Sequence, residues 1–244
     1  MPALLRLPAH REAFQALKAG MQVPHVPLDA TAISSGFSAL DEALGGGFPR
    51  GTIASLEGAA SSGRMAIAAR MLAAASRTGL AAMIDDQSLY PPDLALAGVR
   101  LERLLVVPVE KPIEIARAAD IVLRSQAFGL MLIPAVTLKA AVWSRLATIA
   151  QRANSLLVAL GGDASNELAY FASTRVGCSI ERVLWTNSGG LFCEFAGYEV
   201  DTKILKHKRS APGKHARLLV RIPCEAALQE RCLLRPRLDA AASS

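Results

Sequence analysis

The stretch at residues 51–65 reads GTIASLEGAASSGRM. Its first seven residues form a short apolar run that is typical of a buried strand, and the Ala-rich residues 64–77 that follow the loop are predicted as a helix. A strand, a loop bounded by Gly58 and Gly63, and a helix in this order are the context of a phosphate-binding P-loop, GxxxxGK[ST]. The stretch therefore predicts an α/β domain with a degenerate P-loop.

Two residues depart from the P-loop pattern. In an intact loop, backbone N–H groups surround the phosphates, a Lys reaches the terminal phosphates and a Ser or Thr hydroxyl binds Mg²⁺. Arg64 stands in place of the Lys and keeps its charge on a bulkier planar group. Met65 stands in place of the hydroxyl residue and offers Mg²⁺ no oxygen. No cofactor is expected, and any ATP binding is expected to be weak.

The residues of this degenerate loop that would hold a nucleotide are Gly58, Ser61, Ser62, Gly63, Arg64 and Met65. A plainer interpretation also stays open, in which the loop is only a tight turn before a helix. The sequence around the loop helps to weigh the two.

Strand and helix patterns alternate after the loop. Apolar runs predict strands at 80–84, 104–109, 130–133 and 155–160, with helices at 113–125 and 138–152 between them. Apolar strands without polar alternation, each followed by a helix, predict a mostly parallel sheet flanked by helices on both faces. Four further strands are expected to form antiparallel hairpins at one edge, because turn sequences separate residues 173–185, 191–198, 199–208 and 216–222.

The chain divides into three predicted parts. Residues 1–32 contain an amphipathic helix at 4–20 and a Pro-containing linker, residues 33–223 form the α/β core, and residues 224–244 form a tail with a helical pattern from Glu225 onward. A length of 244 residues suits one such domain with short extensions.

Composition limits the class of protein. With 52% hydrophobic and 20% charged residues, the chain is expected to fold around a core. No apolar run reaches the roughly 20 residues of a membrane span, and the first residues lack a secretory signal pattern, so a cytoplasmic location is expected. The four cysteines lack metal-binding spacing, so no metal site is expected. The net charge of +6 favours contact with a polyanion or an acidic protein surface.

Three blocks of sequence resemble the RecA family. The first, residues 33–64, reads ISSGFSALDEALGGGFPRGTIASLEGAASSGR and is similar to the RecA core entrance and P-loop. The second, residues 166–182, reads NELAYFASTRVGCSIER and resembles a RecA strand with an aromatic pair before Ala-Ser-x-Arg. The third, residues 204–222, reads ILKHKRSAPGKHARLLVRI and resembles the RecA Lys-x-Lys hairpin. The resemblance implies a RecA-like core.

Against that resemblance, three catalytic positions are changed. The family's water-activating Glu corresponds to Gln87, with Asp86 next to it as an alternative carboxylate. The Asp that helps to hold Mg²⁺ corresponds to Pro134, and the polar sensor of the next strand falls at Gly161 and Gly162. The segments 134–155 and 160–166 are also too short for the two DNA-binding loops of RecA. The chain is therefore predicted not to hydrolyse ATP.

Within the RecA-like group, the chain most resembles ImuA, a small RecA-related component of a damage-inducible mutagenesis cassette. That resemblance implies an adaptor in translesion synthesis whose partners are an ImuB-like polymerase homologue, an error-prone C-family DNA polymerase and RecA. The alternative is an ATP-dependent, DNA-binding recombinase or switch with an unusual P-loop.

Two surfaces are candidates for those contacts. A basic hairpin carries Lys203, Lys206, Lys208, Arg209 and Lys214. It is interpreted as a solvated edge strand, as an old subunit interface, or as a contact to DNA phosphates without sequence preference.

The N-terminal helix is the other candidate, because its Phe14 and Leu17 face either packs on its own core or binds a partner. Core packing is expected for Trp143 and Trp185.

Overall fold

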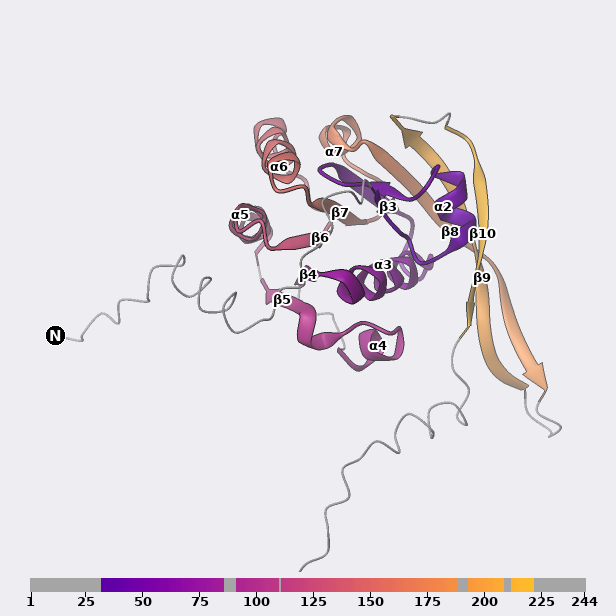
Figure 1. The fold of residues 1–244 in the computed structure, drawn as a ribbon. Coiled ribbons are helices and arrows are strands. Elements are labelled where there is room, and N and C mark those ends of the chain that lie inside the picture. Colours follow the sequence, from indigo (N-terminus) through magenta and orange to yellow (C-terminus); the bar gives the residue numbers. More distant parts are fainter. Residues whose placement is uncertain (1–31, 86–90, 110, 188–192, 209–211, 222–244) are drawn as a thin grey trace, which may run out of the picture.

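The computed structural model describes residues 32–85, 91–109, 111–187, 193–208 and 212–221. The helix expected at residues 4–20, with Phe14 and Leu17, lies outside these ranges. So do the tail at 224–244 and the positions Asp86, Gln87 and Arg209. The fold that follows is that of the described residues (Figure 1).

An eight-stranded sheet runs through the described part of the chain in the order β10-β9-β8-β3-β7-β6-β4-β5. Its strands are β3 (Ile53–Glu57), β4 (Leu80–Asp85), β5 (Leu104–Pro108), β6 (Phe128–Pro134), β7 (Leu156–Gly161), β8 (Thr174–Asn187), β9 (Cys193–His207) and β10 (His215–Arg221). The strands from β8 to β5 pair in parallel, whereas β9 and β10 are antiparallel. This confirms the predicted mostly parallel sheet with hairpins at one edge.

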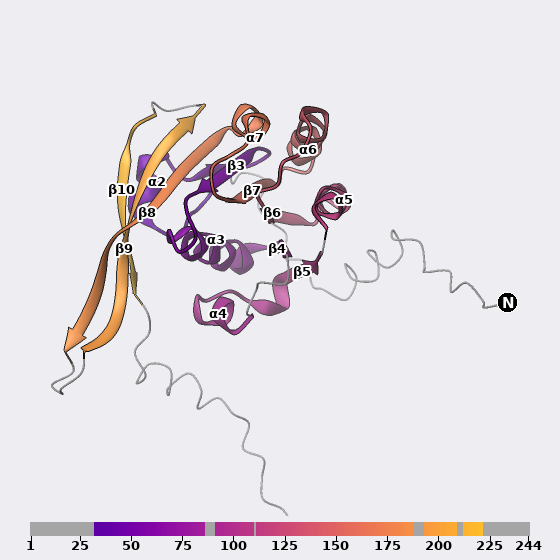
Figure 2. The ribbon, with the colours of Figure 1, turned by 180° about the vertical axis from the view of Figure 1, so that it is seen from behind.

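Helices cover both faces of the sheet (Figures 1 and 2). One face packs against α2 (Ser38–Ala43), α3 (Arg64–Thr78) and α4 (Pro91–Leu96). The other packs against α5 (Pro112–Arg124), α6 (Ala140–Arg152) and α7 (Asn166–Phe171). The remaining short elements are β1 (Ala32–Ile33), β2 (Phe48–Pro49) and the 3₁₀ turn η1 (Leu101–Arg103).

The alternation of side chains explains why the central strands are apolar over most of their length. Along β4, Ala81 and Met83 enter the core under α3, whereas Ala82 and Ile84 enter the core under α5 and α6. Successive side chains of a strand point to opposite faces. Because both faces are covered, neither set of positions is polar.

Two expectations about the C-terminal third were wrong. Residues 191–198 and 199–208 were expected as separate strands, but β9 is continuous because both of its neighbours pair across the supposed break: Tyr198 pairs with Val183 and with Val220. Residues 166–171, assigned to a strand by resemblance, form α7. The Ser165 hydroxyl accepts a hydrogen bond from the N–H of Leu168, which caps the start of that helix.

Candidate functional site: the P-loop and the β8–β9 ribbon

The loop between β3 and α3 keeps the backbone shape of a P-loop. Gly58 has φ +154° and Gly63 has φ +86°, a left-handed conformation that favours glycine. A Cβ at Gly63 would lie 2.4 Å from Cγ2 of Val200, so β9 passes too close for any other residue. The glycines of the motif are therefore required by the packing of this chain itself.

Arg64 folds back onto its own loop. Its Nη1 donates hydrogen bonds to the carbonyl oxygen of Gly58 and, at 2.5 Å, to that of Ala59. A guanidinium donates in a rigid planar fork. A phosphate bound in the loop would compete with these two carbonyl oxygens for the same cation.

Met65 and Ser62, on either side of Gly63 and Arg64, leave the mouth of the loop without oxygen ligands. The side chain of Met65, 43% exposed, stands where the motif has its Mg²⁺-binding hydroxyl. The hydroxyl of Ser62 is buried and has no hydrogen-bond partner among the described residues. Neither side chain presents an oxygen ligand at the surface.

The neighbouring strand ends also lack the family's polar groups. Pro134 is the last residue of β6 and Gly161 is the last residue of β7, as the sequence predicts for the two substituted positions. A Cβ at Gly161 would lie 2.3 Å from Cβ of Ala135, so this strand end has no space for a side chain. At the end of β4, the described carboxylate next to the predicted position Gln87 is that of Asp85, which is buried.

A partly buried ion pair directly before the loop was not predicted. Arg175 donates from Nε to Oε1 of Glu57 at 2.7 Å and from Nη2 to Oε2 at 2.8 Å. Ser55 and the N–H of Ala164 also donate to this carboxylate. Burial raises the pKa of Glu57, but these hydrogen bonds and the charge of Arg175 outweigh it and leave the pKa below its ordinary value.

A sequence signal for this pair exists. Glu57 ends a buried strand in which Ser55 is the other polar residue, and a buried carboxylate requires a hydrogen-bonded cation. Arg175 is the arginine of the Ala-Ser-x-Arg block, and β8 pairs in parallel with β3 at this level. The arginine of that block therefore holds the strand that leads into the P-loop.

In the basic hairpin, the end of β9 lies level with the start of β3, whereas the P-loop follows the end of β3. His207 pairs with Thr174, and Thr174 in turn pairs with Ala54 near the start of β3. Lys206 is partly buried and donates to the carbonyl oxygens of Ala169 and Tyr170, at 2.8 and 2.9 Å. Burial, and then the charges of Lys208 and Arg175, lower the pKa of Lys206.

The exposed cations among the predicted hairpin residues are Lys203, Lys208 and Lys214. The hairpin thus divides into one lysine that caps α7 and three lysines that face solvent. Lys203 pairs with Gly177, which in turn pairs with Glu57 directly before the P-loop, whereas Lys208 lies beside Ser173, near the start of β3.

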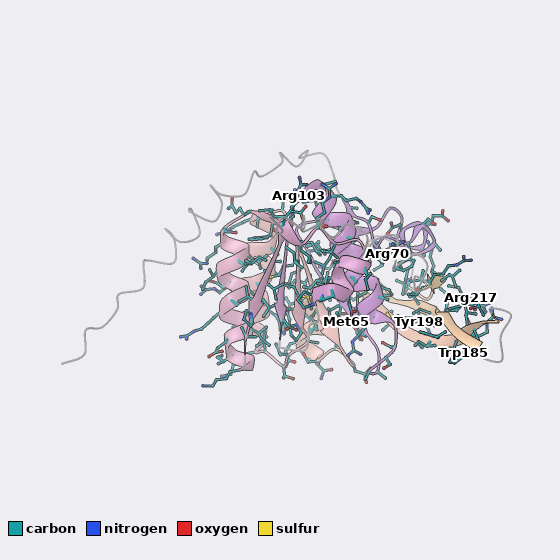
Figure 3. The ribbon with its side chains drawn as sticks, turned by 90° about the horizontal axis from the view of Figure 1, so that it is seen from below. Met65, Arg70, Arg103, Trp185, Tyr198 and Arg217 are labelled. Carbon is teal, nitrogen blue, oxygen red and sulfur yellow. The ribbon has the colours of Figure 1, made fainter. Side chains whose placement is uncertain are left out.

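An apolar recess lies beside the P-loop instead. It has a volume of about 340 Å³ and runs from Gly63, Met65 and Ala66 to the ribbon formed by β8 and β9. Figure 3 shows Met65, Tyr198 and Trp185 following one another from α3 out along this ribbon. Trp185 is 62% exposed, so the expectation that it packs in the core was wrong, whereas Trp143 is fully buried.

No group of three or more His, Cys, Asp or Glu side chains is placed to hold a metal ion within the described ranges. No helix in the same part of the chain is long and apolar enough to cross a membrane.

Comparisons with known proteins agree with this fold. The family model described as the RecA N-terminal domain matches residues 16–146, more than half of the chain. Protein RecA of Corynebacterium aurimucosum is 42% identical over 108 residues, which cover 43% of this chain and 29% of that protein. Protein RecA of a Picosynechococcus species is 40% identical over 106 residues, which cover 43% and 30%. The similarity thus spans less than a third of these relatives.

A solved structure extends the likeness in fold beyond the matched segment. The crystal structure of the RadB recombinase aligns with a TM-score of 0.62 and 17% sequence identity, over 77% of this chain and 96% of the RadB chain. At that identity the likeness concerns the fold alone. Together with the P-loop backbone at the carboxyl end of β3, the family match leads to one conclusion: the chain belongs to the RecA N-terminal domain family.

Proposed function

We propose that this chain is a non-hydrolysing RecA-like adaptor in DNA-damage-induced translesion synthesis and mutagenesis, the role that its resemblance to ImuA implies. Its proposed partners are an ImuB-like polymerase homologue, an error-prone C-family DNA polymerase and RecA. Any contact of its own with DNA is proposed to be a non-specific one to phosphates.

One observation carries the proposal: the P-loop mouth is occupied by the chain's own groups. Arg64 donates to the carbonyl oxygens of Gly58 and Ala59, and Met65 stands where Mg²⁺ needs an oxygen. Phosphoryl transfer relies almost entirely on positioning and charge stabilisation. Removing one such stabilising group typically slows a reaction by about 10²- to 10³-fold. Changes at Arg64, Met65, Pro134 and Gly161 together support a role without turnover.

A second candidate function has its own support. The loop retains the left-handed glycines Gly58 and Gly63, and Asp85 places a carboxylate at the end of β4. An ATP-dependent recombinase or switch with an unusual site would use these features. The first proposal is preferred because the substitutions at Met65 and Pro134 remove oxygen ligands that such a site needs for Mg²⁺.

The test in vitro measures ATP binding and ATP turnover separately, with and without single-stranded DNA. We expect no DNA-stimulated turnover above background, and we expect Arg64→Lys together with Met65→Thr to strengthen binding without turnover, since Pro134 stays in place. DNA-stimulated turnover at the rate of an ordinary RecA-like ATPase, lost in Asp85→Asn, would support the second candidate. Gly63→Asp is a poor control, because any side chain there collides with Val200.

The test in cells separates mutagenesis from recombination. Deletion of the gene is expected to lower damage-induced mutation and to leave homologous recombination intact, and co-purification is expected to recover the ImuB-like protein or RecA. Loss of recombination with an unchanged mutation frequency would contradict the adaptor role.

A further inference from the structure

Beyond the end of β10, the strands β8 and β9 continue as a two-stranded ribbon. Arg221, the last residue of β10, pairs with Gly197, whereas β8 and β9 stay paired as far as Asn187 and Cys193. Figure 1 shows this ribbon projecting past the body of the fold. The sheet face that α2 and α3 cover in the body of the fold therefore continues onto the ribbon, where no described helix lies over it.

Register shifts gather apolar side chains on that face of the ribbon. Residues directly opposite each other in neighbouring strands share a face, and Ile180 pairs with the core residue Val200. The register shifts in β8 between Ile180 and Arg182, which brings Val183 to the same side as Ile180. We define the apolar ribbon face as these side chains, the aromatic residues that follow them and the helix residue beside them: Met65, Ile180, Val183, Trp185, Phe195 and Tyr198.

The apolar ribbon face is open to solvent and is held together by its aromatic rings. Ile180, Val183 and Phe195 are between 38% and 43% exposed, and Trp185 is 62% exposed. The ring of Trp185 lies edge-on to that of Phe195, with 5.6 Å between centroids, and the ring of Phe195 stacks on that of Tyr198 at 6.3 Å. Contiguous exposed apolar side chains of this kind mark an interaction surface in a folded protein.

The end of this surface beside the P-loop is positively charged. Among the described residues that line the recess of about 340 Å³, Arg64 is the one with a charged side chain. The N-cap residue Gly63 has no side chain and the first turn of α3 has no acidic residue, so the free N–H groups there have no negative partner within the helix. The buried hydroxyl of Ser62 lies 2.5 Å from the position of a Cβ on Gly58 and has no hydrogen-bond partner among the described residues. The mouth of the loop therefore favours a negatively charged group.

A carboxylate suits this mouth better than a nucleotide does. Nη1 of Arg64 donates to the carbonyl oxygens of Gly58 and Ala59, which leaves Nε and Nη2 to donate to an incoming group. A guanidinium binds a carboxylate through two parallel hydrogen bonds without a metal ion. A triphosphate brings several negative charges and relies on Mg²⁺ to neutralise them, and Met65 offers that ion no oxygen.

The size of the apolar ribbon face indicates a helix as its occupant. The stretch of β8 from Ile180 to Trp185 extends over about 17 Å at the strand rise of about 3.3 Å per residue. A helix of about 11 residues has the same length. In the body of the fold, α3 covers this same face of the sheet and packs with Val176 and Val200 in one core. A further helix laid along the ribbon continues that layer.

We propose that the apolar ribbon face and the mouth of the degenerate P-loop form one docking site for an amphipathic helix of another protein. The helix places large apolar side chains on the ribbon and an Asp or Glu carboxylate against Arg64 and the N-terminus of α3. The loop that binds a nucleotide phosphate in an intact motif thus recognises a side-chain carboxylate here. The proposal does not depend on the role of the chain in mutagenesis.

Selection from a peptide library on the full chain tests the proposal. The probe is a phage-displayed library of random peptides of about 16 residues, long enough for about four helical turns. We expect the enriched peptides to carry Leu, Ile or Phe at helical spacing together with an Asp or Glu. One enriched peptide without Trp is then synthesised as the acid and as the matching amide, Asn or Gln. The amide is expected to bind about tenfold more weakly, because it cannot form an ion pair with the guanidinium.

Fluorescence of the chain's own tryptophans reports where the peptide binds. Trp185 is 62% exposed and within reach of acrylamide, whereas Trp143 is fully buried. We expect the bound peptide to protect Trp185 from quenching by acrylamide. This readout locates the peptide on the ribbon without any substitution in the protein.

Two substitutions with matched controls separate the apolar contact from the charged one. Phe195→Ser and Arg64→Met are each expected to weaken peptide binding about tenfold while the fold stays intact by circular dichroism. Leu219→Ser is the control for the first, because Leu219 is 43% exposed but lies on β10 outside the recess. Arg77→Met is the control for the second, because Arg77 is exposed in the last turn of α3. Both controls are expected to bind like the wild type.

The acid and amide peptides keep the test decisive even if a protein variant fails to fold. Equal affinity of the two peptides, or enriched peptides that lack an acidic residue, would overturn the proposal. So would a library that yields no peptide able to protect Trp185. Protection of Trp185 that rises with the concentration of the chain alone would also overturn it and would assign the face to a second copy.

Discussion

Arg175 binds Glu57 through two parallel hydrogen bonds, from Nε at 2.7 Å and from Nη2 at 2.8 Å, and so joins the start of β8 to the last residue before the P-loop. Both side chains are largely withdrawn from water, at 24% and 6% exposure. In such a pair, the loss of one partner leaves a buried charge uncompensated. The pair is therefore expected to be a main determinant of stability at this edge of the sheet.

Arg175→Met should lower the free energy of unfolding by about 3 kcal/mol, near the lower end of the cost of breaking a buried pair. The double variant Arg175→Met with Glu57→Gln should lose less than Arg175→Met alone, because no charge is then left unpaired. Urea unfolding at pH 7 measures both. If the double variant were the less stable one, Glu57 would not owe its ionised state to Arg175.

The same pair predicts how stability depends on pH. The pKa of Glu57 in the folded chain lies below its ordinary value of 4.5. Its contribution is therefore fully present above pH 4.5 and is lost as the pH falls below 4.5 through the lowered pKa. In urea unfolding at decreasing pH, the difference in stability between the wild type and Glu57→Gln should shrink in this range. A difference in stability between the two proteins that stays constant with pH would contradict a lowered pKa of Glu57.

Two lysines of the hairpin should behave differently on substitution. Lys206→Met removes the hydrogen bonds to the carbonyl oxygens of Ala169 and Tyr170 and should cost about 1 kcal/mol of stability. Lys208→Met is the matched control, because its exposed side chain should make little difference. Thermal unfolding of the two variants checks this, and equal midpoints would argue against a capping role for Lys206.

Any DNA binding should depend on the exposed lysines and on salt. We expect the affinity for single-stranded DNA to fall with rising salt and to show no sequence preference, because lysines contact phosphates as point charges. Replacing Lys203, Lys208 and Lys214 by Ala should flatten the salt dependence by roughly one phosphate contact for each lysine. Fluorescence anisotropy titrations at several salt concentrations measure the slope of affinity against salt. An unchanged slope would show that the lysines of the hairpin do not contact the DNA phosphates.

Gly161 should resist restoration of a side chain. Gly161→Ala places a Cβ 2.3 Å from Cβ of Ala135 and should destabilise the fold by about 1 to 3 kcal/mol. Gly162→Ala is the control, since no heavy atom lies within 4 Å of its new Cβ. Adding Ala135→Gly to Gly161→Ala should recover part of the loss. Equal stability of the Gly161 and Gly162 variants would show that the strand end has room for a sensor side chain.

The architecture around the P-loop could be predicted from local sequence patterns. The strand of residues 51–57, its glycines and the Ala-rich helix were readable because a doubly covered strand must be apolar throughout and a tight loop requires left-handed residues. The substitutions at Met65, Pro134 and Gly161 could also be predicted. Met65 stands at a fixed position of the P-loop motif, and Pro134 and Gly161 directly follow the predicted strands 130–133 and 155–160.

Contacts between groups that are far apart in the sequence could not be predicted in this way. Glu57 and Arg175 are 118 residues apart, and only the parallel pairing of β3 with β8 brings them within hydrogen-bond distance. The pairing of β9 with β8 likewise places Lys206 opposite Arg175 and lets its ammonium reach the carbonyl oxygens of Ala169 and Tyr170. Trp185 is a large aromatic residue of a kind that often packs in a core, and yet it lies exposed on the ribbon, because β8 runs beyond the helices that would cover it. Local patterns fix how a segment folds, whereas contacts between segments depend on strand order and register, which short-range periodicity does not encode.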